Sequence, residues 1–148
     1  MLFGSILDLG NINSNICVRS GSLLKTDQEI LPIELVKRNL YTINGSKIIS
    51  LTETVYTEVS LILIKKNALG KNKPNIDTFI TKTHKLLINN RLINPYKLIN
   101  GINIIEIYTK SELLYNILLE SGRIMVINNI EMETLDPNNK IAKLYLNN

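Results

Sequence analysis

The sequence has few of the side chains that bind metal ions or form disulfides. It holds one cysteine and one histidine in 148 residues, whereas a Cys/His zinc site needs three or four ligands and a disulfide needs two cysteines. Both kinds of site are therefore excluded, and we expect neither a metal ion nor a cofactor. Apolar residues make up 45% of the chain, which is enough for one core without such cross-links.

Aromatic residues and long apolar runs are also scarce. Aromatic residues make up 5% of the chain and tryptophan is absent, so a platform that stacks the bases of single-stranded nucleic acid is not expected. No segment approaches the roughly 20 apolar residues that span a bilayer. Residues 1–15 lack the basic start of a secretory signal, and Asp8 interrupts their short apolar run. We therefore expect a cytoplasmic or virion protein that is not secreted.

The net charge of +4 is mild and is spread along the chain. The most basic segment, 65–74, reads KKNALGKNKP, but it lacks the glycine spacing and the Ser or Thr of a phosphate-binding P-loop. We interpret it as a solvated turn, and we expect no specific nucleic-acid partner. Asn, Ile, Lys and Leu are abundant, which suggests the codon bias of an AT-rich genome, as in large DNA viruses and some microbes.

Short strands separated by turn residues dominate the pattern. Segments rich in Ile, Val, Thr and Tyr alternate with turns such as Asn44-Gly45, for which we expect a hairpin. A helical turn is expected over 33–39, and a short terminal helix or strand over 140–146. The pattern predicts a single all-β domain, with strands at 21–26, 46–51, 54–66, 78–83, 84–89, 102–109, 114–120 and 123–128.

Three segments together resemble the Hint domain, the fold shared by hedgehog autoprocessing domains and inteins, and above all the intein-like proteins of bacteria and large viruses. The first segment carries a cysteine, a Gly-Ser step, a strand that ends in Thr, and Pro-Ile-Glu-x-Leu. The second carries Thr-x-x-His, and the third a Tyr-containing strand, an Asn-rich turn and a Glu-Thr step. The matching residues are Cys17, Gly21, Ser22, Thr26, Pro32, Ile33, Glu34, Leu35, Thr81, His84, Tyr115, Asn129, Glu133 and Thr134.

The resemblance implies a compact, horseshoe-shaped all-β fold and a self-processing site. In this family the cysteine attacks the carbonyl that precedes it and converts a peptide bond into a thioester. Cys17 would then be the nucleophile, His84 would protonate the departing Cys17 nitrogen, and Thr81 would orient the scissile Ile16–Cys17 bond. A thiol and an imidazole suit this chemistry because the first is a strong nucleophile once deprotonated and the second titrates near neutral pH.

The spacing of Thr81 and His84 makes a structural prediction. Residues an odd number of positions apart point to opposite faces of a flat strand. Both side chains reach the same peptide bond only if the chain bends between them, and we expect this kink at Lys82–Thr83.

Several residues depart from the family pattern. Arg38-Asn39 stands where the family usually has Gly-Asp, and the branched side chain of Ile16 crowds the carbonyl under attack. The region 126–139 lacks the His-Asn pair with which splicing inteins end, and a single histidine would have to serve both ends. Full splicing is therefore not expected.

These departures favour a Hint-fold structural or assembly protein, such as a minor capsid component of a virus particle, with a degenerate or latent processing site. Residues 1–16 would be an arm that docks on protein partners, 17–136 the domain, and 137–148 a tail. The alternative is an active autoprocessing domain that makes an N–S acyl shift at Ile16–Cys17, followed by cleavage or acyl transfer. A nucleic-acid or small-molecule binding module has no specific motif to support it.

Overall fold

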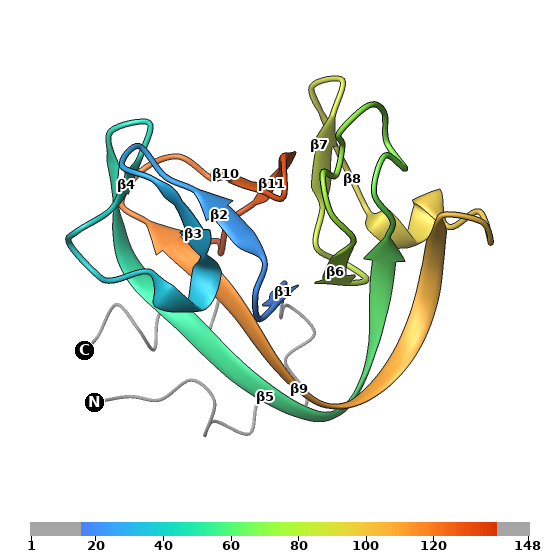
Figure 1. Cartoon of the computed structure of the whole chain (residues 1–148). Helices are drawn as coiled ribbons and strands as arrows, with labels where there is room; N and C mark the ends of the chain where they lie inside the picture. Colours follow the sequence, from blue (N-terminus) through green and yellow to red (C-terminus); the bar gives the residue numbers. More distant parts are fainter. Residues whose placement is uncertain (1–15, 139–148) are drawn as a thin grey trace.

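Residues 16–138 of the chain are described by a computed structural model, and they form two antiparallel sheets with two short 3-10 helices. This confirms the predicted all-β fold. Figure 1 shows a horseshoe whose two arms are joined by one long, curved pair of strands. The segment 140–146 lies outside the described residues.

The long pair consists of β5 (Ser46–Ile64) and β9 (Ile104–Leu119), which run side by side from Ile48↔Leu119 to Ile64↔Ile104 with one irregularity between Ile48 and Ser50. The sequence predicted two shorter strands in place of each. The predicted short strands are continuous in the structure because β5 and β9 pair with each other along nearly their whole length. The contacts between their side chains outweigh the weak strand preference of the residues in between.

Two short strands connect the arms of this pair. β1 (Val18–Arg19) pairs with β9 at Val18↔Tyr115, and β6 (Thr78–Thr81) pairs with the end of β5. β1 and β6 meet at a single register position, Val18↔Ile80. Strands β5, β6, β1 and β9 therefore form a closed ring of paired strands, and the chain enters this ring next to the predicted nucleophile.

The second sheet has six strands, in the order β3, β2, β10, β11, β7 and β8. In that order their bounds are Ile30–Pro32, Leu23–Lys25, Ile124–Ile127, Ile130–Glu133, Leu86–Ile88 and Arg91–Ile93. Its hairpins turn through Asn128-Asn129 and Asn89-Asn90, where all four residues have positive φ, as two-residue hairpin turns require. The predicted turn at Asn44-Gly45 is also present, between β4 (Thr42–Ile43) and β5.

The 3-10 helix η2 (Ile33–Leu35) confirms the helical turn that we expected in 33–39, and a second one, η3, covers Pro95–Leu98. No helix between residues 16 and 138 is long and apolar enough to cross a membrane.

The core has a large and a small part. The large part lies between the two sheets, and buried Asn128 connects them there, since its side chain accepts a hydrogen bond from the Leu23 amide and donates one to Thr78 Oγ1. The small part contains Cys17, Leu61 and Leu114 from the ring of strands. Adjacent residues of a strand point to opposite faces, so Val18 enters the large core while Cys17 enters the small one.

Candidate active site

Cys17 lies at the start of β1, and its side chain is almost completely buried, with 3% exposed. Its neighbours in the small core are apolar: Leu61, Leu114, Phe79 and Ile107, with Tyr56 and Val59 at the margin. Burial raises the pKa of the Cys17 thiol to about 12, because an apolar environment disfavours the thiolate. The thiol is therefore protonated at neutral pH and needs a base at the moment of attack.

Thr81, the last residue of β6, holds the backbone of Cys17. Its hydroxyl accepts a hydrogen bond from the Cys17 amide at 3.0 Å and faces the Cys17 carbonyl oxygen at 3.4 Å. The Thr81 amide donates to the same carbonyl at 3.0 Å. The predicted orienting residue therefore contacts the nitrogen of the Ile16–Cys17 peptide bond directly.

His84 is fully buried beside the same segment. Its Nε2 lies 2.6 Å from the carbonyl oxygen of Glu133, and because a carbonyl only accepts, Nε2 must carry the hydrogen. Nδ1 is then unprotonated in the neutral ring, and this buried atom has no hydrogen-bond partner among residues 16–138. Burial lowers the pKa of His84, an effect that the backbones of Glu133 and Cys17 and the charge of Glu133 only partly oppose. The neutral ring with a free acceptor nitrogen is therefore the favoured form.

The kink predicted between Thr81 and His84 is present. β6 ends at Thr81, residues 82 and 83 form a turn, and the His84 amide donates to the Thr81 carbonyl at 3.1 Å. This turn takes the place of the bulge that a continuous strand would need, and it lets Thr81 and His84 approach the Cys17 backbone together.

Asn116 is a site residue that the sequence analysis missed. It is fully buried on β9, and its side-chain Nδ2 donates to the Ile16 carbonyl oxygen at 2.5 Å. Its Oδ1 accepts from the Ile117 amide at 2.8 Å, which fixes which end of the amide faces Ile16. The sequence offered one indication of this role. Asn116 carries the single side-chain amide in the apolar run 113–119, LLYNILL, and a buried side-chain amide needs hydrogen-bond partners.

The Ile16–Cys17 peptide bond is thus held from both sides. Its oxygen accepts from Asn116 and its nitrogen donates to Thr81, while His84 lies close enough to the Cys17 backbone for it to affect the pKa of the imidazole. A donor that faces a carbonyl oxygen stabilises the negative charge that develops there during attack. The arrangement can therefore position and polarise this bond for a nucleophile.

Ion pairing and stacking hold β1 in place around the site. Arg19 binds Glu112 of β9 through two hydrogen bonds of 2.8 and 3.1 Å, and its guanidinium lies 3.7 Å from the centre of the Phe79 ring. Glu34 of the Pro-Ile-Glu segment accepts from the Gly21 amide and the Ser20 hydroxyl in the turn after β1. These contacts give the matching residues of the first segment a structural role.

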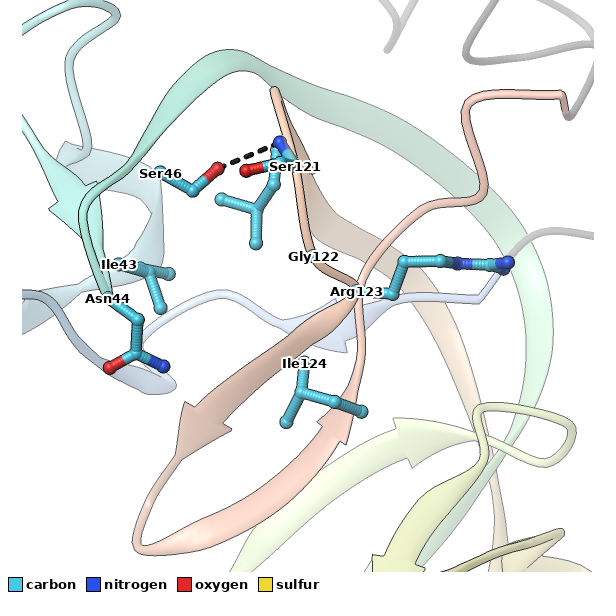
Figure 2. A pocket seen from close by; sticks show the side chains of 8 residues that line it. Ile43, Asn44, Ser46, Ser121, Gly122, Arg123 and Ile124 are labelled. Carbon is cyan, nitrogen blue, oxygen red and sulfur yellow. Dashed lines mark hydrogen bonds between the residues drawn. The ribbon is translucent and has the colours of Figure 1, made fainter.

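One pocket lies away from these residues. It has a volume of about 260 Å³ and lies between the β4–β5 turn and the β9–β10 connection. Figure 2 shows the Arg123 side chain extending away from the other lining residues. Arg123 pairs with Asp136 at 3.2 Å, and neither Cys17, Thr81, His84 nor Asn116 lines this pocket. Within residues 16–138, no three Asp, Glu, His or Cys side chains could hold a metal ion.

By sequence, the chain matches no family model and no curated protein. By structure, it is similar to a DnaB intein from Synechocystis sp. PCC 6803, with a TM-score of 0.57 and 14% identity over 81% of this chain and 99% of that one. A bacterial intein-like domain from Clostridium thermocellum has a TM-score of 0.60 and 12% identity, over 80% of this chain and 98% of that one. The gp41-1 intein has a TM-score of 0.58 and 12% identity, over 82% of this chain and 100% of that one.

The chain has a Hint-like fold. The predicted resemblance is confirmed at the level of the fold. At these identities the similarity shows the fold and transfers no activity.

Proposed function

We propose that this Hint-like chain is a single-turnover self-processing domain that converts the Ile16–Cys17 peptide bond into a thioester. The observation that carries the proposal is the pair of hydrogen bonds on that bond, from Asn116 to its oxygen and from its nitrogen to Thr81. A reactive bond held in fixed orientation next to its nucleophile gains a large rate advantage over the same bond in solution.

The first step is attack of the Cys17 sulfur on the Ile16 carbonyl carbon. Because burial keeps the thiol protonated, the sulfur must lose its proton as it attacks, and the unpartnered Nδ1 of neutral His84 is the acceptor. The carbonyl oxygen becomes an oxyanion, and the Asn116 amide stabilises it.

In the second step the carbon–nitrogen bond breaks. The imidazolium returns the same proton from Nδ1 to the Cys17 nitrogen, which leaves as an amine, and the Ile16 acyl group remains on sulfur. One proton has moved from sulfur to nitrogen, one C–N bond has become one C–S bond, and His84 is neutral again. Water or an added nucleophile then cleaves the thioester and releases residues 1–16.

The assembly role remains a prediction. Residues 1–15, which would form most of the docking arm, lie outside the described residues, and no feature of residues 16–138 points to a virion or capsid partner. The departures at Arg38 and Asn39 do not touch the site, since both side chains are exposed. The branched side chain of Ile16 does not prevent Asn116 from reaching the Ile16 carbonyl oxygen.

The proposal is tested by the intact mass of the purified protein during incubation with dithiothreitol. Release of residues 1–16 from the wild type, with none from Cys17→Ala, is the expected result. The Cys17→Ser variant is the matched control, since its hydroxyl is a weaker nucleophile and should cleave far more slowly. An intact wild-type chain, or equal cleavage of Cys17→Ala, would overturn the proposal.

A further inference from the structure

Several buried residues carry a hydroxyl group that takes no part in the mechanism above, and Thr134 differs from the others in that its Oγ1 has no hydrogen-bond partner among residues 16–138. Thr134 follows β11, and its side chain is fully buried. A buried hydroxyl without a partner costs about 1–3 kcal/mol relative to a paired one, and such groups are rare in native proteins. An unpaired hydroxyl at this position therefore calls for an explanation.

The peptide bond before Thr134 is held at both ends. The carbonyl oxygen of Glu133 lies 2.6 Å from His84 Nε2, and the Thr134 amide donates to the Arg123 carbonyl at 2.7 Å. Two bonds to Lys85 fix Glu133 itself, since its amide donates to the Lys85 carbonyl at 3.1 Å and its carboxylate accepts from the Lys85 amide at 2.8 Å.

The two ends of the His84 ring therefore face two different segments. Nε2–H donates to the carbonyl of the Glu133–Thr134 bond, whereas Nδ1 has no hydrogen-bond partner among residues 16–138 and is the base at Cys17 in the function proposed above. Each of these two peptide bonds is followed by a residue whose side chain carries a nucleophile on Cβ, sulfur in Cys17 and oxygen in Thr134.

We propose that Glu133–Thr134 is a second self-processing bond, at which Thr134 Oγ1 attacks the Glu133 carbonyl carbon in an N–O acyl shift. The His84 Nε2–H stabilises the oxyanion that forms on the Glu133 oxygen. The hydroxyl proton ends on the Thr134 nitrogen as the C–N bond breaks, and the Glu133 acyl group ends on Thr134 Oγ1 as an ester. Hydrolysis of this ester frees residues 134–148.

Attack by Thr134 is slower than attack by Cys17, because an alcohol is a weaker nucleophile than a thiol. Only a small fraction of the protein carries the ester at equilibrium. A strong nucleophile cleaves this ester and so drives the reaction forward. Since the reaction does not use Cys17, it goes beyond the function proposed above and can be tested without it.

The test uses the full-length Cys17→Ala protein, in which the first reaction is abolished. The folded protein is incubated with hydroxylamine, and intact mass spectrometry follows the appearance of residues 134–148. Three variants are compared in this background: Thr134→Ser, Thr134→Val and the parent. The fragment masses separate this cleavage from the known sensitivity of Asn-Gly bonds to hydroxylamine, here Asn44-Gly45 and Asn100-Gly101.

The expected result is release from the parent, several-fold faster release from Thr134→Ser because its hydroxyl is less hindered, and none from Thr134→Val. Thr134→Val should remain folded, because it has nearly the same shape and removes a hydroxyl without partners; a thermal unfolding curve checks this. No release from the folded parent, or the same release from Thr134→Val, would overturn the proposal.

Discussion

The side-chain amide of Asn116 donates a hydrogen bond of 2.5 Å to the carbonyl oxygen of Ile16, a hundred positions earlier in the chain. The contact exists because β1 pairs with β9 at Val18↔Tyr115, which brings the peptide bond before Cys17 next to the strand that carries Asn116. Of all the contacts in the site, this one most directly connects the closed ring of strands with the proposed chemistry.

Replacing Asn116 by Asp should reduce the rate of cleavage at Ile16–Cys17 by about 10²–10³-fold. The carboxylate keeps the acceptor that binds the Ile117 amide but has no donor for the Ile16 oxygen, and its charge repels the oxyanion. The rate is measured from intact masses over time. An unchanged rate in a folded variant would show that Asn116 has only a structural role.

Thr81→Val should slow the same cleavage by about 10- to 100-fold, because the methyl group that replaces the hydroxyl cannot accept the hydrogen bond of the Cys17 amide. Thr81→Ser keeps the hydroxyl and should retain most of the rate. Serine keeps the hydroxyl of threonine, whereas valine keeps its shape without the hydroxyl. Equal cleavage rates for the two variants would therefore contradict the assigned role.

The cleavage rate should fall at acidic pH, with no steep rise at high pH. His84 must be neutral to accept the thiol proton, and burial places its pKa below the ordinary 6.5. Protonation therefore removes the base only on the acid side of neutrality. If free thiolate were the nucleophile instead, the rate would climb about tenfold per pH unit toward the thiol pKa of about 12, and a profile of that shape would exclude His84 as the base.

Asn128→Ala should lower the free energy of unfolding by about 3 kcal/mol. The change leaves the half-buried Leu23 amide without its acceptor and buried Thr78 Oγ1 without its donor, and it places alanine at a φ of 48°. Asn129→Ala, in the same turn but exposed, removes one surface hydrogen bond to the Asn72 carbonyl and should cost about 1–2 kcal/mol. Urea unfolding in the Cys17→Ala background measures both, and similar losses would contradict the bridging role of Asn128.

Much of the fold was predictable because local chemistry determined it. Asn-Gly and Asn-Asn pairs mark the hairpin turns. In the described part of the chain, eight of the nine non-glycine residues with positive φ are asparagines, the residue that tolerates this conformation best after glycine. We attributed the high asparagine content to codon bias alone, but many of these asparagines also adopt the positive φ angles that the turns require. The length of β5 and β9 was not predictable, because it depends on pairing between segments 40 to 70 residues apart.

The arrangement of the candidate site was predictable in part. Cys17, Thr81 and His84 came from an ordered motif, and the kink after Thr81 followed from the two-residue period of a strand. Asn116 was not predicted because its contact with Ile16 depends on the register between β1 and β9, which no local sequence pattern specifies. The tautomer of His84 was not predictable either. The Glu133 carbonyl that determines it belongs to a strand about 50 residues later in the chain.

The most direct test of the central claim is to identify the product that forms when neutral hydroxylamine is added to the wild-type protein. If the Ile16 acyl group moves to the Cys17 sulfur, residues 1–16 should appear with a hydroxamate on Ile16, together with a fragment that begins at Cys17, and Cys17→Ala should give neither. A wild-type chain that stays intact, or a released peptide whose end is not Ile16, would contradict the account.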